Sequence, residues 1–349
     1  SLPFPLSGTL LSGSLARRPS PLPASLSPAG PGHAPGPPPA PGGAAPCPAP
    51  AVPPRSRLRP ALAVLAVALL GGRHADSRVP PAGKAQQGLK EQYRLGSLLG
   101  RGGFGSVFAA TRLSDGAPVA IKRVPRNRVR HWGELVSDAP LEIVLLAKVS
   151  TGFPGVVQLL EWLVLPNDIV MVLERPERCQ DLQHFIRARR FLPEEEARGL
   201  FRQVLEAVRH CTSCGVLHRD IKPENILVDL ATGQAKLIDF GCGTYLQDTV
   251  YTRFAGTRSY SPPEWTHFGW YYGRPATIWS LGILLHQMVC GEHPFRRDRS
   301  LLQLTGSFCF LCPECKDLIR RCLSMLDSVE RPSLEELLCD PWMQDIHLP

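Results

Sequence analysis

The sequence lacks an apolar run long enough to cross a membrane. Its longest unbroken apolar stretch, Ala61 to Leu70, has ten residues, whereas a helix that spans a bilayer requires about twenty. The stretch also lies too far from the N-terminus for a standard signal or transit peptide. We interpret it as an ordinary Ala/Leu/Val tract and expect no membrane partner.

Acidic residues are nearly absent from the first 89 positions, where Asp76 stands against eight lysines and arginines. The net charge of +8 is therefore concentrated in this segment, and the remainder of the chain is close to neutral. The basic residues are scattered and are not clustered with aromatic residues, as they are in nucleic-acid-binding surfaces. We expect no nucleic-acid partner.

Large apolar side chains are also scarce in this segment, which holds 20 of the 36 prolines mixed with Ala, Gly and Ser. Proline removes backbone donors and glycine adds chain entropy, so the segment cannot offset the cost of ordering. We predict a disordered tail over residues 1–89, whose Pro-x-x-Pro patterns are typical ligands of SH3-type modules. The first residue is Ser1 instead of methionine, so we expect the sequence to be a fragment or to carry a misassigned start.

Cysteine is not scarce, but the eleven cysteines are spread along the chain and do not indicate a small disulfide-rich domain. We expect reduced thiols. Cys309, Cys312 and Cys315 form two CxxC steps, and Cys211 with Cys214 forms another. Structural zinc requires four ligands, and the sequence places no fourth ligand beside either group, so we do not predict a zinc site.

From Tyr93 onward the pattern changes first to short β-rich runs and then to helical spacing of apolar residues. The predicted strands cover residues 93–99, 105–111, 119–124, 156–163 and 169–173, with one helix over 141–149 among them. The predicted helices beyond Asp181 cover residues 183–190, 194–211, 279–289, 315–324 and 333–338. The pattern predicts an α+β fold of two lobes over residues 93–343: an antiparallel β lobe (93–173), a connector (174–180) and a larger helical lobe (181–343).

A glycine-rich segment lies between the first two predicted strands and fits the pattern GxGxxGxV. Glycines at such a turn allow the backbone N–H groups to approach a triphosphate, although a simple tight turn is the alternative. We therefore place the segment among the candidate nucleotide-binding residues, which are Leu99, Gly100, Arg101, Gly102, Gly103, Phe104, Gly105, Ser106 and Val107.

Lys122 lies in an otherwise apolar strand, where an unpaired ammonium group would be costly. Glu142 lies in the next helix and is the expected partner. A solvent-exposed lysine is the alternative. Ala120, in the same strand, is grouped with the nucleotide-binding residues.

The most specific pattern is the run His218 to Asn225, followed by Asp239-Phe240-Gly241. Its parts match those of phosphoryl transfer from ATP to a hydroxyl group. Asp220 would accept the proton of the attacking hydroxyl, Lys222 would steady the transferring phosphoryl group, and Asn225 with Asp239 would hold Mg²⁺. The sequence therefore predicts a Ser/Thr protein kinase that uses ATP and Mg²⁺.

Farther along the chain, Pro262-Pro263-Glu264 is similar to a kinase motif whose glutamate pairs with a distant arginine, here Arg331. Between Asp239 and Glu264 there are several residues that could accept a phosphate, and the sequence does not single one out: Thr244, Thr249, Tyr251, Thr252 and Thr257.

From about residue 90 to its end, the chain resembles the PIM family of Ser/Thr kinases. The connector reads Leu173-Glu174-Arg175-Pro176, and Thr277 stands where most kinases have aspartate; Leu237 to Gly241, Ser261 to Trp265 and Asp340 to Asp345 also look like PIM sequence. Since Pro176 has no N–H, the resemblance implies a single connector hydrogen bond to adenine, from the Glu174 carbonyl. It also implies a domain that is active without activation-loop phosphorylation. We further expect a monomer with a cytoplasmic or nuclear location.

PIM kinases prefer arginines before the target residue, which acidic side chains bind. Asp181, Glu224 and Glu292 remain as candidate substrate-binding residues, and Asp181 is also grouped with the nucleotide site. The other positions where the family usually has acids hold different residues, namely His184, Pro223, Arg253, Ala255 and Gln287. We therefore expect a relaxed preference for arginine. The segment Ser300 to Pro313 does not look like PIM sequence.

Two other functions fit the same fold. One is a pseudokinase that acts as a scaffold through the fold and the Pro-rich tail. Such proteins usually lack the lysine or one of the aspartates, and this chain keeps Lys122, Asp220 and Asp239. The other is a small-molecule phosphotransferase, which the Pro262-Pro263-Glu264 motif and the helical region beyond it disfavour.

Overall fold

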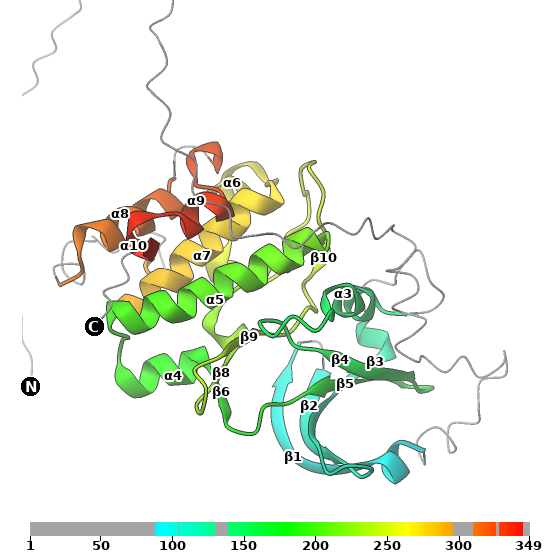
Figure 1. The fold of residues 1–349 in the computed structure, drawn as a ribbon. Helices are drawn as coiled ribbons and strands as arrows, with labels where there is room; N and C mark the ends of the chain where they lie inside the picture. The colour runs from blue at the N-terminus through cyan, green and yellow to red at the C-terminus, as the bar shows by residue number, and fades with distance from the viewer. Residues whose placement is uncertain (1–87, 104, 130–138, 296–309, 326–327, 345–349) are drawn as a thin grey trace, which may run out of the picture. The chain divides into compact units, whose positions relative to one another are not determined.

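The computed structural model describes residues 88–103, 105–129, 139–295, 310–325 and 328–344 (Figure 1). Contacts divide the chain into Ser1–Pro50 and Ala51–Pro349, and every described residue belongs to the second unit. The predicted tail up to residue 87, Phe104 of the glycine-rich segment, and residues 300–309 lie outside the described residues.

The first part of the fold is an antiparallel sheet in the order β1-β2-β3-β5-β4 (Figure 1). Its strands are β1 (Tyr93–Gly102), β2 (Gly105–Arg112), β3 (Pro118–Pro125), β4 (Leu159–Val164) and β5 (Asp168–Glu174). Helix α3 (Leu141–Val149) follows β3 in the chain and buries six of its nine residues. The sheet confirms the predicted antiparallel β lobe.

The alternation of side chains along β3 determines which way Lys122 points. Successive residues of a strand face opposite sides of the sheet. Ile121 packs with Val170 and Val172 in a small apolar cluster, whereas Met171, the partner of Lys122 in β5, belongs to the main core together with α3. Lys122 therefore lies on the side of the sheet that carries α3.

The second part of the fold is mainly helical. Its helices are α4 (Leu182–Arg189), α5 (Glu194–Ser213), α6 (Pro263–Phe268), α7 (Gly273–Cys290), α8 (Pro313–Cys322), α9 (Leu334–Leu338) and α10 (Pro341–Gln344). Short strands form two small sheets, β6 (Cys179–Asp181) with β8 (Ile226–Asp229) and β9 (Ala235–Leu237), and β7 (Val216–Leu217) with β10 (Thr244–Tyr245). The 3-10 turns are η1 (Arg126–Arg128), η2 (Pro223–Asn225), η3 (Arg258–Tyr260) and η4 (Ser328–Glu330).

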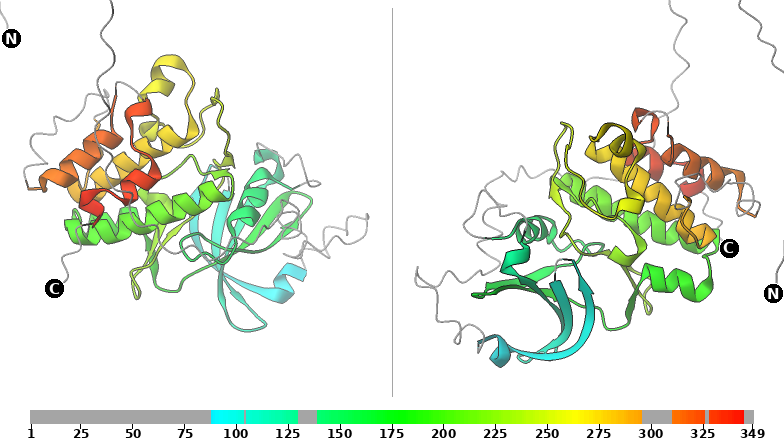
Figure 2. Two further views of the ribbon diagram at one scale, coloured as in Figure 1. Left: turned by 45° about the horizontal axis from the view of Figure 1, so that its top comes forward. Right: turned by 180° about the vertical axis from the view of Figure 1, so that it is seen from behind.

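Helix α5 shows why this part folds as it does. Three glutamates occupy its first turn, where negative charge is favoured by the helix dipole. Leu200, Phe201, Val204, Leu205 and Val208 are buried at spacings of one and three residues, which places them on one face. That face packs against α7, which is buried along most of its length, and the two helices lie side by side in both views of Figure 2.

The predicted helix over 141–149 coincides with α3, and the other predicted helices are confirmed with shifted ends. Helix α7 begins at Gly273, six residues before the predicted start. The short strands β6 to β10 and the helices α6 and α10 were not predicted. Within the part of the chain that the structure describes, no helix combines the length and the apolar character needed to cross a membrane.

Candidate active site

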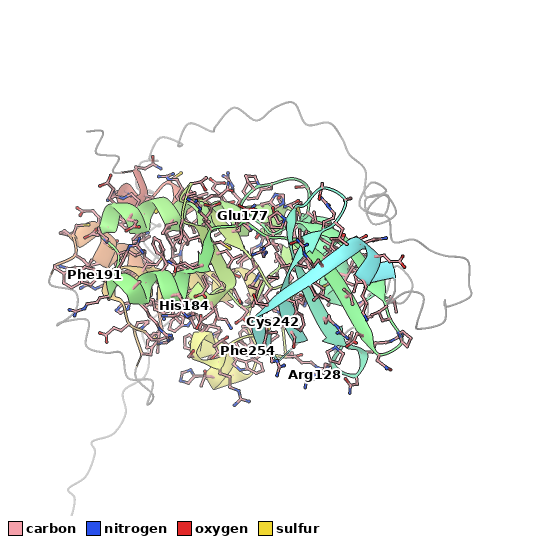
Figure 3. The ribbon with its side chains drawn as sticks, turned by 90° about the horizontal axis from the view of Figure 1, so that it is seen from below. Arg128, Glu177, His184, Phe191, Cys242 and Phe254 are labelled. Atoms are coloured by element: carbon pink, nitrogen blue, oxygen red, sulfur yellow. The ribbon has the colours of Figure 1, made fainter. Side chains whose placement is uncertain are left out.

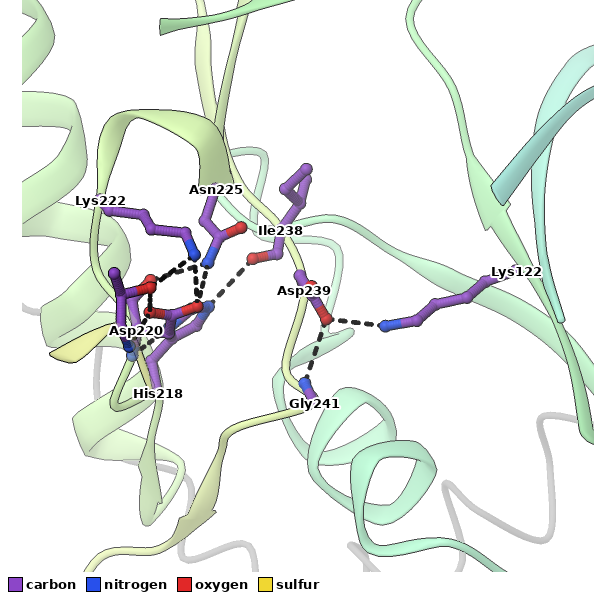
Figure 4. A network of polar contacts seen from close by, with 9 residues as sticks. Lys122, His218, Asp220, Lys222, Asn225, Ile238, Asp239 and Gly241 are labelled. Atoms are coloured by element: carbon purple, nitrogen blue, oxygen red, sulfur yellow. Dashed lines mark hydrogen bonds and ion pairs between the residues drawn. The ribbon is translucent and has the colours of Figure 1, made fainter. Parts of the chain in front are cut away.

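The loop between β7 and η2 places Asp220 at the centre of a hydrogen-bond network (Figure 4). One carboxylate oxygen of Asp220 accepts bonds from the Thr257 N–H and hydroxyl, at 2.9 and 2.8 Å. The other accepts a bond from Asn225 Nδ2 at 3.0 Å and lies 2.9 Å from Lys222 Nζ. Asp220 is buried, so these contacts fix the direction in which its carboxylate points.

His218 holds this loop in place through both of its ring nitrogens. Its Nδ1 accepts the Asp220 N–H at 3.2 Å, and its Nε2 lies 3.0 Å from the carbonyl of Ile238. Burial lowers the pKa of His218, which agrees with a neutral ring that accepts at Nδ1 and donates at Nε2. The ring of Phe240 packs edge-on against the same imidazole, with the two ring centroids 4.8 Å apart. His218 thus joins the segment around Asp220 to the segment around Asp239.

Lys122 connects β3 to α3 through Glu142 and to the segment at Asp239, a contact drawn in Figure 4. Its Nζ lies 2.6 Å from Glu142 Oε1 and 2.7 Å from Asp239 Oδ1. Burial lowers the pKa of Lys122, but the two carboxylates outweigh this effect and the pKa is raised. For Asp239, burial raises the pKa and the charge of Lys122 more than compensates, so its pKa is lowered. The predicted Lys122–Glu142 pair is therefore present, and Asp239 shares it.

Two non-glycine residues of these loops have left-handed backbone conformations. The φ angles are 66° at Arg219 and 62° at Asp239. Such conformations cost energy in residues with a side chain and occur preferentially at functional sites. Arg219 donates to the carbonyls of Cys242 and Gly243, at 2.7 and 3.2 Å. These bonds hold the segment that follows Asp239 against the loop of Asp220.

The glycine-rich segment forms the turn between β1 and β2. A Cβ atom added at Gly100, Gly102 or Gly103 would meet no protein atom within 4 Å, whereas at Gly105 it would lie 2.1 Å from the Arg123 carbonyl. Gly105 is thus required by the packing of β2 on β3. The other three glycines have no such requirement among the described residues, which is compatible with the close approach of a ligand or with a simple tight turn.

Glu174 of the predicted connector and Asp181, the first residue of the predicted helical lobe, both have partners within the fold. The Glu174 carboxylate accepts the Gln158 N–H at 2.9 Å and lies 3.0 Å from Lys236 Nζ. Asp181 caps α4 by accepting the His184 N–H at 2.9 Å, and its second oxygen lies 2.6 Å from His184 Nδ1. The carboxylate of Asp181 is therefore engaged on both oxygens.

The remaining predicted site residues lie around this centre. Glu224 in η2 and Glu292 after α7 are exposed. Ala120 is buried in β3. Leu99 and Arg101 are exposed in β1, and Ser106 and Val107 are half-buried in β2.

Glu264 and Arg331 form the predicted pair. Arg331 donates two hydrogen bonds to the Glu264 carboxylate, at 2.9 and 2.7 Å, and both side chains are buried. The guanidinium also lies over the ring of Trp279 at 4.9 Å. This bidentate pair anchors the start of α6 to the loop before α9.

Asn225 and Asp239 have the chemistry of a magnesium site. Both hydrogen bonds of the Asn225 side chain use Nδ2, so its oxygen takes no part in them. Lys122 and the Gly241 N–H both bond to Oδ1 of Asp239, so Oδ2 is not used in either contact. One amide oxygen and one carboxylate oxygen suit Mg²⁺, which completes its coordination with phosphate oxygens and water. Among the described residues, no group of three or more His, Cys, Asp or Glu side chains is arranged to hold a metal.

Sequence reasoning did not single out Thr257 or assign a role to His218. Thr257 contacts both Asp220 and Lys222, and its hydroxyl accepts from Lys222 Nζ at 2.7 Å. It lies in a segment with several other threonines, so only the fold distinguishes it. His218 directly precedes Arg219-Asp220, and this position was the one available signal.

Comparison with known proteins agrees with this geometry. The protein kinase domain family matches residues 93–343. The chain is 45% identical over 276 residues to serine/threonine-protein kinase pim-2 of Danio rerio, an alignment that covers 75% of this chain and 89% of the relative. It is 44% identical over 262 residues to serine/threonine-protein kinase prk-2 of Caenorhabditis elegans, covering 73% of this chain and 59% of that protein.

A more distant relative is the SNF1-related protein kinase catalytic subunit alpha KIN12 of Arabidopsis thaliana, which is 32% identical over 265 residues. That alignment covers 74% of this chain and 52% of the relative. The three alignments cover nearly the same share of this chain. They cover different shares of the relatives, from 52% to 89%.

Proposed function

The chain belongs to the protein kinase family and, within it, to the PIM serine/threonine kinases, and from this premise we propose a role for each polar residue of its active site. Protein kinases transfer the γ-phosphate of ATP to protein substrates and use Mg²⁺. The observation that carries the proposal is the joint placement of Asp220, Lys222, Asn225 and Asp239 on two adjoining loops (Figure 4).

We assign the contact with the substrate hydroxyl to Asp220. Its carboxylate is fixed by Thr257, Asn225 and Lys222, and it would accept the proton as the hydroxyl attacks. Lys222 would stabilise the transferring phosphoryl group, because its ammonium lies beside the same carboxylate. Bound Mg²⁺ and ATP supply the electrophile and neutralise phosphate charge.

Lys122 and the glycine-rich turn would position the nucleotide. Glu142 and Asp239 hold the Lys122 ammonium in place, and this group would bind phosphate oxygens. Asn225 and Asp239 would hold the metal through their oxygens. The adenine would accept no hydrogen bond from Pro176, which has no N–H, and would donate one to the carbonyl of Glu174.

A direct test is to incubate the purified full chain with Mg²⁺, ATP and a Ser/Thr peptide and to measure phosphopeptide by mass spectrometry. We expect turnover by the wild type and a loss of several orders of magnitude in Asp220→Asn, which keeps the shape of the side chain but is a much weaker base. Equal turnover by both proteins would refute the role of Asp220.

The proposed kinase is active without phosphorylation of the segment between Asp239 and Glu264. Arg219 supports this proposal because it donates to the Cys242 and Gly243 carbonyls, so the segment after Asp239 is already bonded to this arginine without a phosphate. Treatment of the purified kinase with a phosphatase should leave its rate unchanged. A large loss of rate would contradict the proposal.

We also propose that selection for arginine upstream of the target is weak. His184 engages both carboxylate oxygens of Asp181, which leaves this acid less available to a substrate arginine. Glu224 and Glu292 remain exposed. A peptide array that showed undiminished selection for arginine three and five residues upstream would overturn this proposal.

The remaining proposals concern the whole protein: that it acts as a monomer in the cytoplasm or nucleus, and that its Pro-rich N-terminal segment binds SH3-type modules. The sequence patterns described above support the last of these. An isolated SH3 domain can be used to pull down the full chain and a variant whose N-terminal prolines are replaced. We expect capture of the full chain and not of the variant, and equal capture of the two would contradict the proposal.

A further inference from the structure

The loop from Tyr251 to Thr257 lies directly against the proposed catalytic residues. Thr257 bonds to Asp220 through its N–H and hydroxyl, and Lys222 donates to the same hydroxyl at 2.7 Å. A Cβ atom added at Gly256 would lie 2.3 Å from the Arg219 carbonyl, so the two backbones are in close contact there. A substrate whose hydroxyl reaches Asp220 must therefore pass beside this loop.

Aromatic residues outside the loop also hold its backbone in place. Tyr251 and Tyr271 exchange two backbone hydrogen bonds, at 2.8 and 3.1 Å. Phe254 stacks on Trp265 with ring centroids 5.6 Å apart, and the Tyr271 hydroxyl donates to the Arg253 carbonyl at 3.2 Å. The backbone of Arg253 is thus held in place. Phe254, the next residue, is labelled in Figure 3, well away from Phe191, which lies two residues beyond the end of α4.

The side chain of Arg253, in contrast, is exposed, and it forms no ion pair with an acidic side chain of the described residues. Some other arginines pair with acids of the fold, as Arg123 does with Asp168 at 2.6 Å and Arg331 with Glu264, whereas Arg253 combines an exposed side chain with a place in the loop that contacts Asp220. An unpaired guanidinium on a fixed backbone is suited to bind a carboxylate or a phosphoryl group, because its donors match two acceptor oxygens.

We propose that Arg253 determines substrate specificity by binding an anionic side chain of the protein substrate, either Asp/Glu or a phosphorylated residue, next to the target hydroxyl. This inference rests on the proposed function and adds to it a substrate class. The exposed acids Glu224 and Glu292 would attract basic residues elsewhere on the substrate. The preferred substrate is therefore of mixed charge, with an anion on the side of Arg253.

The expected effect is modest because the contact is exposed to solvent. Exposed ion pairs typically change an equilibrium by up to about fivefold, and a phosphoryl group carries more charge than a carboxylate. We expect kcat/KM for the best carboxylate peptide to exceed that of its alanine counterpart by about threefold to fivefold at low salt. The preference should shrink as ionic strength rises.

The test uses the full chain and a set of peptides with one serine target. At each flanking position in turn, the peptides carry aspartate, phosphoserine, alanine or arginine, and kcat/KM is measured for each. The set is repeated with Arg253→Asp and with Arg320→Asp. Arg320 is an exposed arginine on α8, on the far side of the helical part from the sheet (Figures 1 and 2), and it is the matched control.

We expect the wild type and Arg320→Asp to prefer an anionic residue at one or two adjacent positions, and Arg253→Asp to prefer arginine at those positions. The aspartate and phosphoserine arms distinguish the two kinds of anion. Phosphorylation of all peptides without an anionic preference, or an anionic preference that survives in Arg253→Asp, would overturn this inference and leave the proposed function intact. If the wild type phosphorylated none of the peptides, both this inference and the proposed function would be overturned.

Discussion

Lys122 and Asp239 are 117 residues apart in the chain, and Nζ of the first lies 2.7 Å from Oδ1 of the second. The first residue belongs to the sheet, and the second follows β9 in the helical part. Because Lys122 also holds Glu142 of α3, one ammonium group links three elements around the proposed nucleotide site.

Replacement of Asp239 by asparagine should reduce peptide phosphorylation by orders of magnitude. The substitution keeps the size of the side chain but removes the charge that would hold Mg²⁺. The measurement is the initial rate of phosphopeptide formation by the full chain at saturating ATP. Equal rates in wild type and Asp239→Asn would refute the metal-binding role, provided that circular dichroism shows both proteins to be folded.

The buried pair Glu264–Arg331 should contribute strongly to stability. Removal of one partner leaves a buried charge without compensation, which typically costs about 3–5 kcal/mol. We expect Glu264→Gln to lower the free energy of unfolding in urea by this order. The double variant Glu264→Leu/Arg331→Met should recover part of the loss, because it leaves no buried charge.

The exposed pair between Arg112 and Asp115 provides a matched control for that experiment, since its side chains are 35% and 48% accessible. Asp115→Asn should have little effect on unfolding. If Asp115→Asn lowered the free energy of unfolding as much as Glu264→Gln does, burial would not be the reason why the Glu264–Arg331 pair stabilises the fold.

Gly256 should be essential for the position of the catalytic loop. Its φ angle is 103°, and an added Cβ would lie 2.3 Å from the Arg219 carbonyl. Gly256→Ala should therefore displace the loop and strongly reduce the rate. Gly199→Ala in α5 is the control, because a Cβ there meets nothing within 4 Å and alanine favours a helix. A fully active Gly256→Ala protein would contradict the described contact.

Stability should decrease as the pH falls below about 6.5, the ordinary pKa of histidine. Burial lowers the pKa of His218 in the folded protein, so the unfolded chain binds a proton first as the pH decreases, and protonation favours unfolding. Burial also lowers the pKa of His286 and of His293, which act in the same direction. We expect His218→Gln to make the free energy of unfolding less dependent on pH between 5 and 6.5. An unchanged slope in urea titrations would count against a buried neutral His218.

Deletion of residues 1–87 should leave the phosphorylation rate nearly unchanged, because the proposed active-site residues lie between positions 99 and 292. The comparison is kcat/KM of the full and shortened chains with the same peptide. A large loss would show that the N-terminal segment takes part in catalysis.

Much of the fold could be predicted because its elements carry local signals. The apolar spacing of Leu141 to Val149 gave α3 with its observed limits, and the short β-rich run from Val119 to Val124 placed Lys122 in an otherwise apolar strand. The short strands could not be predicted, because strands of two to four residues such as β7 and β8 have no periodicity of their own. They form where partners distant in sequence meet, as Leu217 does with Thr244.

The active site was also predicted in part. The motif around Asp220 identified the residue types that phosphoryl transfer requires, and the fold brings them together. The contacts of Thr257 with Asp220 and Lys222 depend on loop geometry, which spacing does not encode. The engagement of Asp181 by His184 is a local helix cap between residues three apart, a signal that the sequence does carry. Lys236 is a buried lysine that pairs with Glu174, and no motif distinguished it from a surface lysine.

The central claim is that this chain binds ATP together with Mg²⁺ between the glycine-rich turn and the pair Asn225–Asp239. Isothermal titration calorimetry of the full chain with ATP, once with Mg²⁺ and once with a chelator, tests it most directly. We predict clear binding with Mg²⁺ and a large loss of affinity without it. Absence of any magnesium-dependent binding in a folded sample would contradict the claim.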